Sequence, residues 1–221
     1  DLFDQEQCSD GMYFFLGQAV NFSNDPLIHN NYIMAAIRVG DFSAVENTVS
    51  KSSAYDAEKI RDFLMNSKLN EKQQGPLITV CDRFGFIEEM TKFFYKRNMM
   101  QNIEIYVQQI NGMNTPKVVG TLLDLQCNED YIKRLVTSAR NTCPIAELVE
   151  QVEKRNRLKL ILDWLEARVN EGNTEPALYN ALAKIYIDDS SKDPSKFLVE
   201  NPYYDSRVVG KFAEPRDPHL A

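Results

Sequence analysis

The sequence predicts an all-α protein, a right-handed α-solenoid in which short antiparallel helix hairpins stack into an elongated rod. Amphipathic stretches of about 10–15 residues, the length of an ordinary short helix, follow one another along the chain. Most begin at a Pro or a small polar residue and end at a Gly or Asn, as helices usually do. No segment alternates polar and apolar residues for long enough to indicate a strand. The prolines near predicted helix starts are Pro116, Pro144, Pro176 and Pro194.

The first predicted helices lie before residue 70. Ser9 is the candidate N-cap of the first helix, and Asp25-Pro26 begins the second. Gly40 lies where a left-handed turn would end the second helix, and Asp41 and Asp56 begin the next two. Spacings of three and four residues place one apolar stripe on each helix. The predicted inward residues are Met12, Phe15, Leu16, Ala19, Val20, Leu27, Ile33, Ala36, Ile37, Val45, Val49, Ile60, Phe63 and Leu64.

The middle of the chain continues the same pattern after a loop. The stretch from Asn70 to Gly75 is predicted to be that loop, because it is charged, rich in Gln and closed by Gly-Pro. A second interruption is predicted from Gly112 to Thr115. The run from Pro76 to Val80 is short enough to fit a strand, but its helical neighbours favour a helix. The predicted helices are Pro76–Arg83, Phe86–Arg97, Gln101–Ile110 and Pro116–Leu125.

The last third contains six further predicted helices, which together complete the all-α pattern. Asn128 caps the first of them, Pro144 begins the second, and a turn or kink is predicted from Lys154 to Asn156. Gly172 ends the third helix. The third helix, Leu158–Val169, carries an apolar stripe of Leu158, Leu162, Leu165 and Val169. The remaining helices are Ala177–Ile187, with Leu178, Ala181, Leu182, Ile185 and Tyr186 on one face, Ser195–Val199 and Tyr203–Lys211.

Composition excludes several classes of function. The net charge of −7 leaves no basic excess to neutralise phosphates, so we expect no nucleic-acid partner and no attachment to an anionic membrane. The apolar runs are too short to span a bilayer, and we expect no insertion into a membrane. The four cysteines are far apart and lack a C-x-x-C spacing, which favours reduced, buried thiols in a cytosolic protein.

The residues that carry catalytic chemistry do not form a recognisable group. His29 and His219 are the only histidines and have no acid or Cys at ligand spacing. Gly85, Gly112 and Gly120 occur singly, so no phosphate-binding loop is formed. The acidic pairs Glu88-Glu89 and Asp188-Asp189 are interpreted as solvated faces rather than acid/base pairs. We therefore expect no catalytic residue, no cofactor site, no metal site and no enzymatic activity.

Other clusters are interpreted as packing or partner contacts. The basic cluster Lys154-Arg155-Asn156-Arg157 with Lys159 is expected to support acidic neighbours or a partner, with phosphate binding as the lesser alternative. The aromatic runs Tyr13-Phe14-Phe15 and Phe93-Phe94-Tyr95, and also Trp164, are expected to be mostly core. The segment Asn201-Pro202-Tyr203-Tyr204 has the form of an N-P-x-Y sorting signal, but its place between two helices favours folding into the stack.

Several long segments resemble the clathrin heavy-chain family, within its distal leg. The longest run is Val152–Asp189 (VEKRNRLKLILDWLEARVNEGNTEPALYNALAKIYIDD), and the second is Asn201–Ala221 (NPYYDSRVVGKFAEPRDPHLA). Shorter similar runs are Tyr13–Leu27, Leu77–Ile87 and Asn102–Gln108. The segments Glu71–Gln74 and Phe212–Pro215 depart from the family pattern. The resemblance runs from the first residues to the last, which makes it far more specific than a short motif.

The resemblance implies a structural role in a vesicle coat. It implies one nearly complete clathrin heavy-chain repeat over residues 1–140 and the start of the next over residues 141–221, joined near Arg140 to Pro144. In the family, three heavy chains form a triskelion whose legs interweave in the polyhedral coat of coated pits and vesicles in endocytosis and intracellular transport. Other heavy chains are then the implied partners, whereas light chains and adaptors bind other parts of the full-length chain. The implied location is cytoplasmic, on the cytoplasmic face of these membranes.

One alternative role remains open from the sequence. A helical solenoid also serves as a docking platform for a peptide or a regulatory partner in vesicle traffic, and an exposed apolar patch along one edge would mark such a platform. Both ends of the sequence are interpreted as cut ends, because it lacks an initiator Met and stops just after Asp217-Pro218, where a helix is expected to begin. A lone leg segment is expected to be monomeric or weakly associating.

Overall fold

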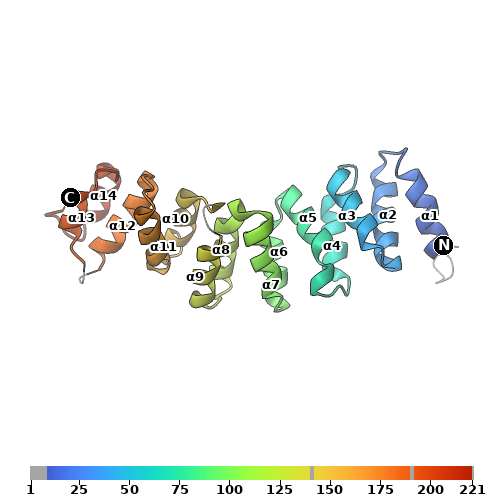
Figure 1. Ribbon diagram of the computed structural model, residues 1–221, viewed down its shortest axis with the longest axis horizontal. Coiled ribbons are helices and arrows are strands. Elements are labelled where there is room, and N and C mark those ends of the chain that lie inside the picture. Colours follow the sequence, from blue (N-terminus) through green and yellow to red (C-terminus); the bar gives the residue numbers. More distant parts are fainter. Residues whose placement is uncertain (1–8, 140–141, 190–191, 221) are drawn as a thin grey trace. The chain divides into compact units, whose positions relative to one another are not determined.

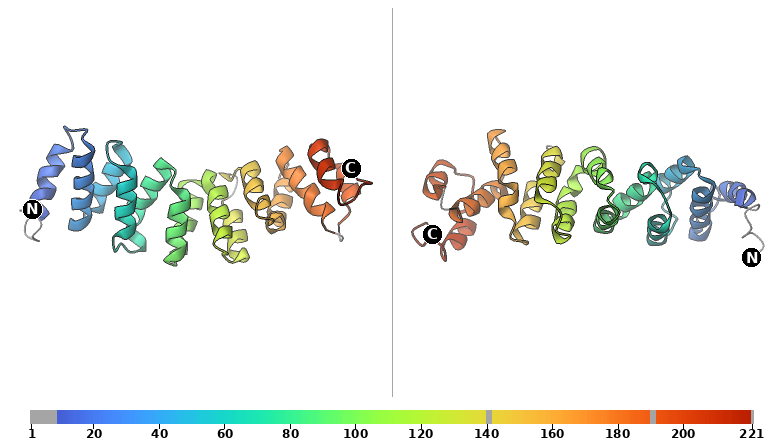
Figure 2. Two further views of the ribbon diagram at one scale, coloured as in Figure 1. Left: turned by 180° about the vertical axis from the view of Figure 1, so that it is seen from behind. Right: turned by 90° about the horizontal axis from the view of Figure 1, so that it is seen from below.

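The computed structural model describes residues 9–139, 142–189 and 192–220, and in these residues the fold is all-α, with fourteen α-helices, four short 3₁₀ or π segments and no strand. The predicted helical fold is therefore confirmed, while the predicted right-handedness stays a prediction. The chain divides into two compact units, unit 1 (Asp1–Asn102) and unit 2 (Ile103–Ala221). Within each unit, successive helices lie side by side in chain order, joined by short connections (Figures 1 and 2).

In unit 1, each helix packs on the next helix, on the one after it, or on both. Helices α2 and α4 contact each other, as do α3 and α5, while consecutive helices such as α1 and α2 form hairpins. This is the packing of a helical-hairpin solenoid. The helices are α1 (Ser9–Ala19), α2 (Pro26–Val39), α3 (Phe42–Lys51), α4 (Ala57–Asn66), α5 (Gly75–Phe84) and α6 (Ile87–Lys96), and the division between the units falls within α7 (Met100–Ile105).

Local signals set the helix ends of unit 1 as predicted. The side chains of Asp25, Asp41 and Asp56 each accept a hydrogen bond from a backbone N–H of the first turn that follows them. Gly40 follows α2 with a φ of 86°, a conformation that favours glycine because it has no Cβ. The predicted loop at Asn70–Gly75 contains a 3₁₀ turn, η1 (Glu71–Gln73), closed by a capping box.

Unit 2 arranges its helices in two rows. Helices α8, α10, α12 and α14 contact one another in that order, and α9 contacts α11 beside them. Each element of one row therefore packs on a hairpin neighbour and on the equivalent helix of the next hairpin. The helices are α8 (Thr115–Asp124), α9 (Glu129–Ser138), α10 (Ile145–Glu153), α11 (Leu162–Asn170), α12 (Pro176–Ile187), α13 (Pro194–Glu200) and α14 (Ser206–Ala213), and the 3₁₀ segments are η3 (Gly112–Asn114) and η5 (Leu158–Ile161).

Four predicted helices differ in detail from the structure. The helix predicted from Gln101 to Ile110 ends as the π-helix η2 (Tyr106–Ile110), which the i, i+3, i+4 pattern does not reveal. The helix predicted from Leu158 to Val169 begins as the 3₁₀ turn η5 before α11. The last predicted helix begins at Ser206, capped by Asp205, rather than at Tyr203. Pro144 occupies the N-cap position of α10 rather than the first helical turn.

Each unit has its own buried apolar core. In unit 1 the fully buried side chains include Ile33, Ile60 and Leu64 from the predicted stripes. In unit 2 the predicted stripe of α12 is buried except for Tyr186, which is half-buried. Of the stripe predicted for Leu158–Val169, only Leu165 is fully buried, while Leu158, Leu162 and Val169 are half-buried. The 3₁₀ start changes the helical register. The side chains buried there are Leu160, Ile161, Trp164 and Leu165.

Candidate functional site

The most distinctive polar feature of unit 2 is a series of ion pairs between successive hairpins. Six pairs among its described residues join side chains that lie 26 to 31 positions apart in the sequence, so each pair links one hairpin to the next. Arg155 is the most tightly placed, because its guanidinium donates to both carboxylate oxygens of Asp124 at 2.7 and 2.6 Å. The pairs are Arg155 with Asp124, Arg157 with Glu129, Lys159 with Asp189, Lys184 with Glu153, Lys192 with Glu166, and Arg216 with Asp188.

Several links between the hairpins of unit 1 are made by buried polar side chains that bond to backbone groups. The Asn30 side chain is 4% exposed, and its Oδ1 accepts a hydrogen bond of 3.0 Å from the backbone N–H of Asp56. Asn102, equally buried, donates from Nδ2 to the carbonyl of Glu71 at 3.0 Å. His29 is the third such residue, and its ring lies between two backbone segments. These groups replace bonds that water would otherwise supply to a buried backbone.

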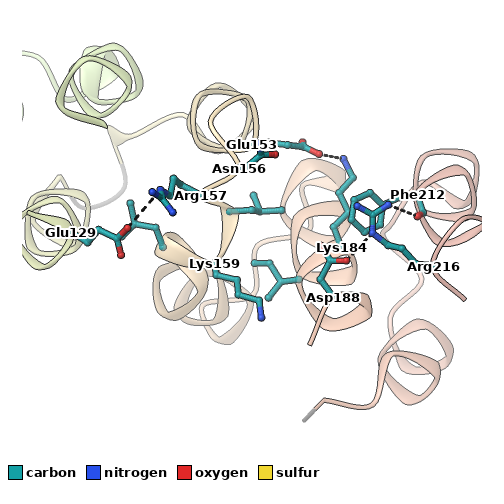
Figure 3. A pocket seen from close by; sticks show the side chains of 12 residues that line it. Glu129, Glu153, Asn156, Arg157, Lys159, Lys184, Asp188, Phe212 and Arg216 are labelled. Atoms are coloured by element: carbon teal, nitrogen blue, oxygen red, sulfur yellow. Dashed lines mark hydrogen bonds and ion pairs between the residues drawn. The ribbon is translucent and has the colours of Figure 1, made fainter. Parts of the chain in front are cut away.

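Three of the six ion pairs of unit 2, and Lys159 from a fourth, line a groove with a volume of about 390 Å³ (Figure 3). Arg157 and Lys159 lie on one side, next to and within η5, and Lys184, Phe212 and Arg216 lie on the other side, on or after α12 and α14 (Figure 3). Acidic and basic side chains alternate around a floor of buried apolar residues. The full lining is Glu129, Glu153, Asn156, Arg157, Leu158, Lys159, Leu160, Lys184, Ile185, Asp188, Phe212 and Arg216.

The Phe212 ring contacts both cations on one wall of this groove. The Arg216 guanidinium lies 3.7 Å from the centre of the Phe212 ring, and the Lys184 ammonium lies 5.6 Å from it. Arg216 also donates to Asp188 at 2.7 Å, and Lys184 pairs with Glu153. Two cations therefore lie over one aromatic ring, and each is also paired with a carboxylate. These contacts hold the side chains of this wall in one arrangement.

The two histidines are far from forming a catalytic or metal site. His29 is 5% exposed; its Nε2 donates to the carbonyl of Ser23 at 2.7 Å, and its Nδ1 accepts from the Ser52 hydroxyl at 3.1 Å. Both ring nitrogens are therefore used in packing. His219 is exposed near the end of the chain. Within residues 9–139, 142–189 and 192–220, no cluster of three or more His, Cys, Asp or Glu side chains is placed to hold a metal ion.

The thiols are buried and protonated. Cys81, Cys127 and Cys143 are buried and free, as predicted, whereas Cys8 lies outside the described residues. Burial raises the pKa of the Cys81 thiol and of the Cys143 thiol to about 12 each. Because the thiolate is the reactive form, these side chains are packing groups rather than nucleophiles.

The remaining sequence clusters have clear positions. Every cation of the basic cluster pairs with a carboxylate, Lys154 with Glu150 of its own helix and the others with neighbouring hairpins, so the prediction that the cluster supports acidic residues is confirmed. The pair Glu88-Glu89 is exposed, as predicted. The second acidic pair instead divides between two hairpins, since Asp188 bonds to Arg216 and Asp189 pairs with Lys159. None of these carboxylates is held as an acid/base dyad.

The aromatic runs behave in opposite ways. Phe94 is fully buried and Trp164 is 5% exposed, which confirms the core prediction for those two residues. Phe14 and Phe15 are 70% and 72% exposed, so the prediction that the first run is mostly core is wrong.

Residues 201–204 form the turn between α13 and α14, where Tyr203 packs on Tyr179 with ring centres 5.1 Å apart. No described helix is both long enough and apolar enough to cross a lipid bilayer.

The groove and the series of ion pairs are the features that the sequence reading missed. In the sequence, these pairs are visible only as opposite charges about 30 residues apart, which is the length of one hairpin repeat. This spacing can be interpreted only when the positions of the hairpins are known. Each unit by itself is a set of stacked hairpins cross-linked by polar side chains. That arrangement defines a helical-repeat protein of the α-solenoid class.

Comparison with known proteins gives the family. The family model described as "Region in Clathrin and VPS" matches residues 1–130 and 136–221. The chain is 55% identical over 220 residues to the clathrin heavy chain of Dictyostelium discoideum and 50% identical over 221 residues to clathrin heavy chain 2 of Homo sapiens. It is 44% identical to the probable clathrin heavy chain of Schizosaccharomyces pombe. Each match covers the whole chain and 13% of the relative. The chain therefore belongs to the clathrin heavy-chain repeat family.

Proposed function

We propose that this chain is a structural segment of a clathrin leg, which supplies length, curvature and lateral leg contacts in the polyhedral coat of pits and vesicles. The observation that carries the proposal is the similarity over the whole chain to clathrin heavy chains, at 44% to 55% identity. The hairpin packing supports it, because helices that repeat the same neighbour contacts propagate along one direction. The segment acts mechanically and carries out no reaction.

The partners and location follow from this role. Other clathrin heavy chains contact the segment in the lattice, and each contact can be weak because many act together. Light chains and adaptors bind elsewhere on the full-length protein, which works on the cytoplasmic face of coated membranes. The isolated segment is monomeric or weakly associating, and its right-handed hairpin stack bends by small adjustments between neighbouring hairpins. Neither nucleic acid nor the membrane interior is a partner.

The repeat organisation is part of the proposal. One clathrin heavy-chain repeat occupies residues 1–140 and the next begins at residue 141. The two separate ranges matched by the family model, 1–130 and 136–221, support a join in this part of the chain. The compact units defined by contacts divide at Asn102 and Ile103 instead, because contacts group neighbouring hairpins whatever repeat they come from. A repeat boundary is a boundary of sequence similarity, and it need not interrupt packing.

A segment exchange tests the strut role. In a full-length heavy chain of a relative, the equivalent segment would be replaced by this chain, and coat assembly would be followed by electron microscopy and by uptake in cells that lack their own heavy chain. Polyhedral coats of normal size with restored uptake are expected. The matched control carries Leu165→Asp in the exchanged segment, which buries a charge in the core of unit 2 and is expected to prevent assembly. An exchanged chain that trimerises but never forms coats, like its control, would overturn the proposal.

A further inference from the structure

We propose that the groove shown in Figure 3 is a docking site for a short extended peptide that carries acidic and apolar side chains in alternation. This goes beyond the role of a strut and assigns a second, binding function to unit 2. The groove has a volume of about 390 Å³, within the range of sites that hold small ligands or a few side chains. Its lining combines three kinds of group, and each fits a different part of such a peptide.

Two cations in the groove are weakly committed to their present partners. Arg157 approaches Glu129 only to 3.7 Å, and both side chains are more than half exposed. Lys159 also makes a long contact, 3.5 Å to Asp189, and its own side chain is 58% exposed, although Asp189 is 26% exposed. Exposed pairs of this kind contribute little free energy, so a carboxylate arriving with a peptide can replace the present partner at low cost. Arg157 and Lys159 are therefore the groups that would receive acidic side chains.

The other two cations have a different role. Lys184 is 14% exposed and pairs with Glu153, and Arg216 stacks on Phe212 while it donates to Asp188 at 2.7 Å. Breaking the Lys184 pair would leave a largely buried ammonium without its partner, which is costly. Arg216 and Asp188 are 42% and 46% exposed, and their pair is held instead by the 2.7 Å contact and by the stacking of Arg216 on Phe212. This wall is preformed and nearly neutral. A peptide would lie against it without rearranging it, so little ordering would oppose binding.

The remaining lining favours a peptide over an inorganic anion or a nucleic acid. Leu160 and Ile185 provide an apolar floor, which a phosphate ion cannot use. The exposed amide of Asn156 has both a donor and an acceptor, the pair that one peptide group requires. Carboxylates are part of the same lining, so a uniformly anionic strand would meet repulsion. A chain that places acidic side chains only at Arg157 and Lys159 would not.

The test measures peptide binding to the whole chain by fluorescence anisotropy. The probe is a short fluorescein-labelled peptide rich in glutamate and leucine, and its counterpart has glutamine in place of glutamate. The glutamate peptide is expected to bind, and the glutamine peptide to bind about tenfold more weakly or not at all. Raising the salt concentration should weaken binding of the glutamate peptide, since its contacts to exposed cations are screened.

A matched pair of variants locates the site. Arg157→Glu with Lys159→Glu is expected to weaken binding of the glutamate peptide by at least about tenfold. Lys133→Glu with Arg134→Glu changes the net charge equally at exposed positions of α9 outside the groove and is expected to leave binding unchanged. Helix content and melting temperature of both variants would show that each is folded. Equal binding of the two peptides, or an equal loss in both variants, would overturn the proposal, because it would indicate general charge attraction rather than this groove.

Discussion

Unit 1 and unit 2 solve the same packing problem with different polar groups. Both stack short hairpins, and both need side chains that reach from one hairpin to the next. In unit 1 the linking groups include the buried and uncharged Asn30, Asn102 and His29, which bond mostly to backbone. In unit 2 they are six ion pairs, and the buried polar side chains there are Thr115 and Thr121 among the described residues.

The difference predicts different weaknesses. When a buried polar side chain is removed, its hydrogen-bond partner is left with neither that bond nor a water molecule to replace it. The resulting loss in the free energy of unfolding is larger than the net contribution of an ordinary hydrogen bond. An exposed ion pair contributes about 0–1 kcal/mol and is screened by salt. Unit 1 should therefore be sensitive to single substitutions and indifferent to salt, and unit 2 should be the reverse. The predictions below test this contrast, from the largest expected effect to the smallest.

His29→Leu should give the largest effect. The substitution removes the bonds to the Ser23 carbonyl and the Ser52 hydroxyl and leaves both groups partly buried. We expect the free energy of unfolding to fall by about 2 kcal/mol. Urea denaturation measures the loss, and hydrogen exchange should place it in α2 and α3.

The matched substitution in unit 2 is Lys192→Met. Lys192 pairs with Glu166 at 3.3 Å, and both side chains are more than a third exposed. We expect a loss below about 1 kcal/mol, because the remaining carboxylate stays hydrated. A loss as large as that of His29→Leu would show that the ion pairs of unit 2 are as indispensable as the buried groups of unit 1, and the contrast would fail.

Salt should separate the units next. Cys81 in unit 1 and Cys143 in unit 2 are both buried thiols, so the rate at which a thiol reagent labels each one reports the opening of its own unit. Raising sodium chloride from about 0.01 M to about 1 M shortens the screening length roughly tenfold. We expect labelling of Cys143, measured by mass spectrometry, to accelerate severalfold more than labelling of Cys81. Equal acceleration at both sites would contradict a special role for the ion pairs.

The helix ends could be predicted from sequence because they depend on neighbouring residues. Asp25, Asp41 and Asp56 cap helices through bonds that span two or three residues, and Gly40 ends a helix through its own φ. The start of α11 could not be predicted. Leu158 begins a 3₁₀ turn, which shifts the buried face to Leu160 and Trp164, and no local residue indicates that shift. Neighbouring residues determine where a helix begins and ends, whereas packing determines which face of the helix is buried after a junction such as η5.

The groove shows the same limit for sites. The cluster from Lys154 to Lys159 was recognisable as a set of charges, but its partners lie one hairpin away and have meaning only once the hairpins are stacked. The exposed Phe14 and Phe15 teach the converse, since an apolar residue at helical spacing is buried only if another element covers that face. The sequence alone indicated the charge or polarity of these residues but not which structural element each of them faces.

Acid should affect one contact of unit 1 through Asp41. Its carboxylate accepts from the Ala44 N–H and from the Tyr13 hydroxyl, and these two bonds lower the pKa of Asp41 below its usual value. A lowered pKa contributes stability that is present above the unfolded value, near about 3.9, and is lost as the pH falls through the folded value. Asn keeps the oxygen that caps α3 but has an NH₂ group where Asp41 Oδ2 accepts from Tyr13, so we expect Asp41→Asn to cost up to about 1 kcal/mol at neutral pH and progressively less as the pH falls below about 4. Denaturation curves at neutral and acid pH measure this difference, and a constant cost would contradict the assignment.

The smallest predicted effect compares two glycines within helices. A Cβ at Gly11 of α1 would meet nothing within 4 Å, whereas at Gly120 of α8 it would lie 2.5 Å from the Gln151 side chain and 3.1 Å from the Arg155 guanidinium. Gly→Ala in an open helix position is favourable by about 0.5–1 kcal/mol, so Gly11→Ala should raise the stability of unit 1. At Gly120 the same gain should be cancelled.

The reason for that cancellation lies in the charged links of unit 2. The new methyl group would first displace the Gln151 side chain, which accepts from Arg155, and would crowd the Arg155 guanidinium that joins α10 to α8 through Asp124. Thermal melts of Gly120→Ala at low and high salt decide the point. A loss relative to Gly11→Ala that shrinks at high salt would show that the close approach at Gly120 serves the ion pair. A loss that salt does not change would mean that α8 and α10 need the glycine for packing alone, and the two units would then differ less than their side chains indicate.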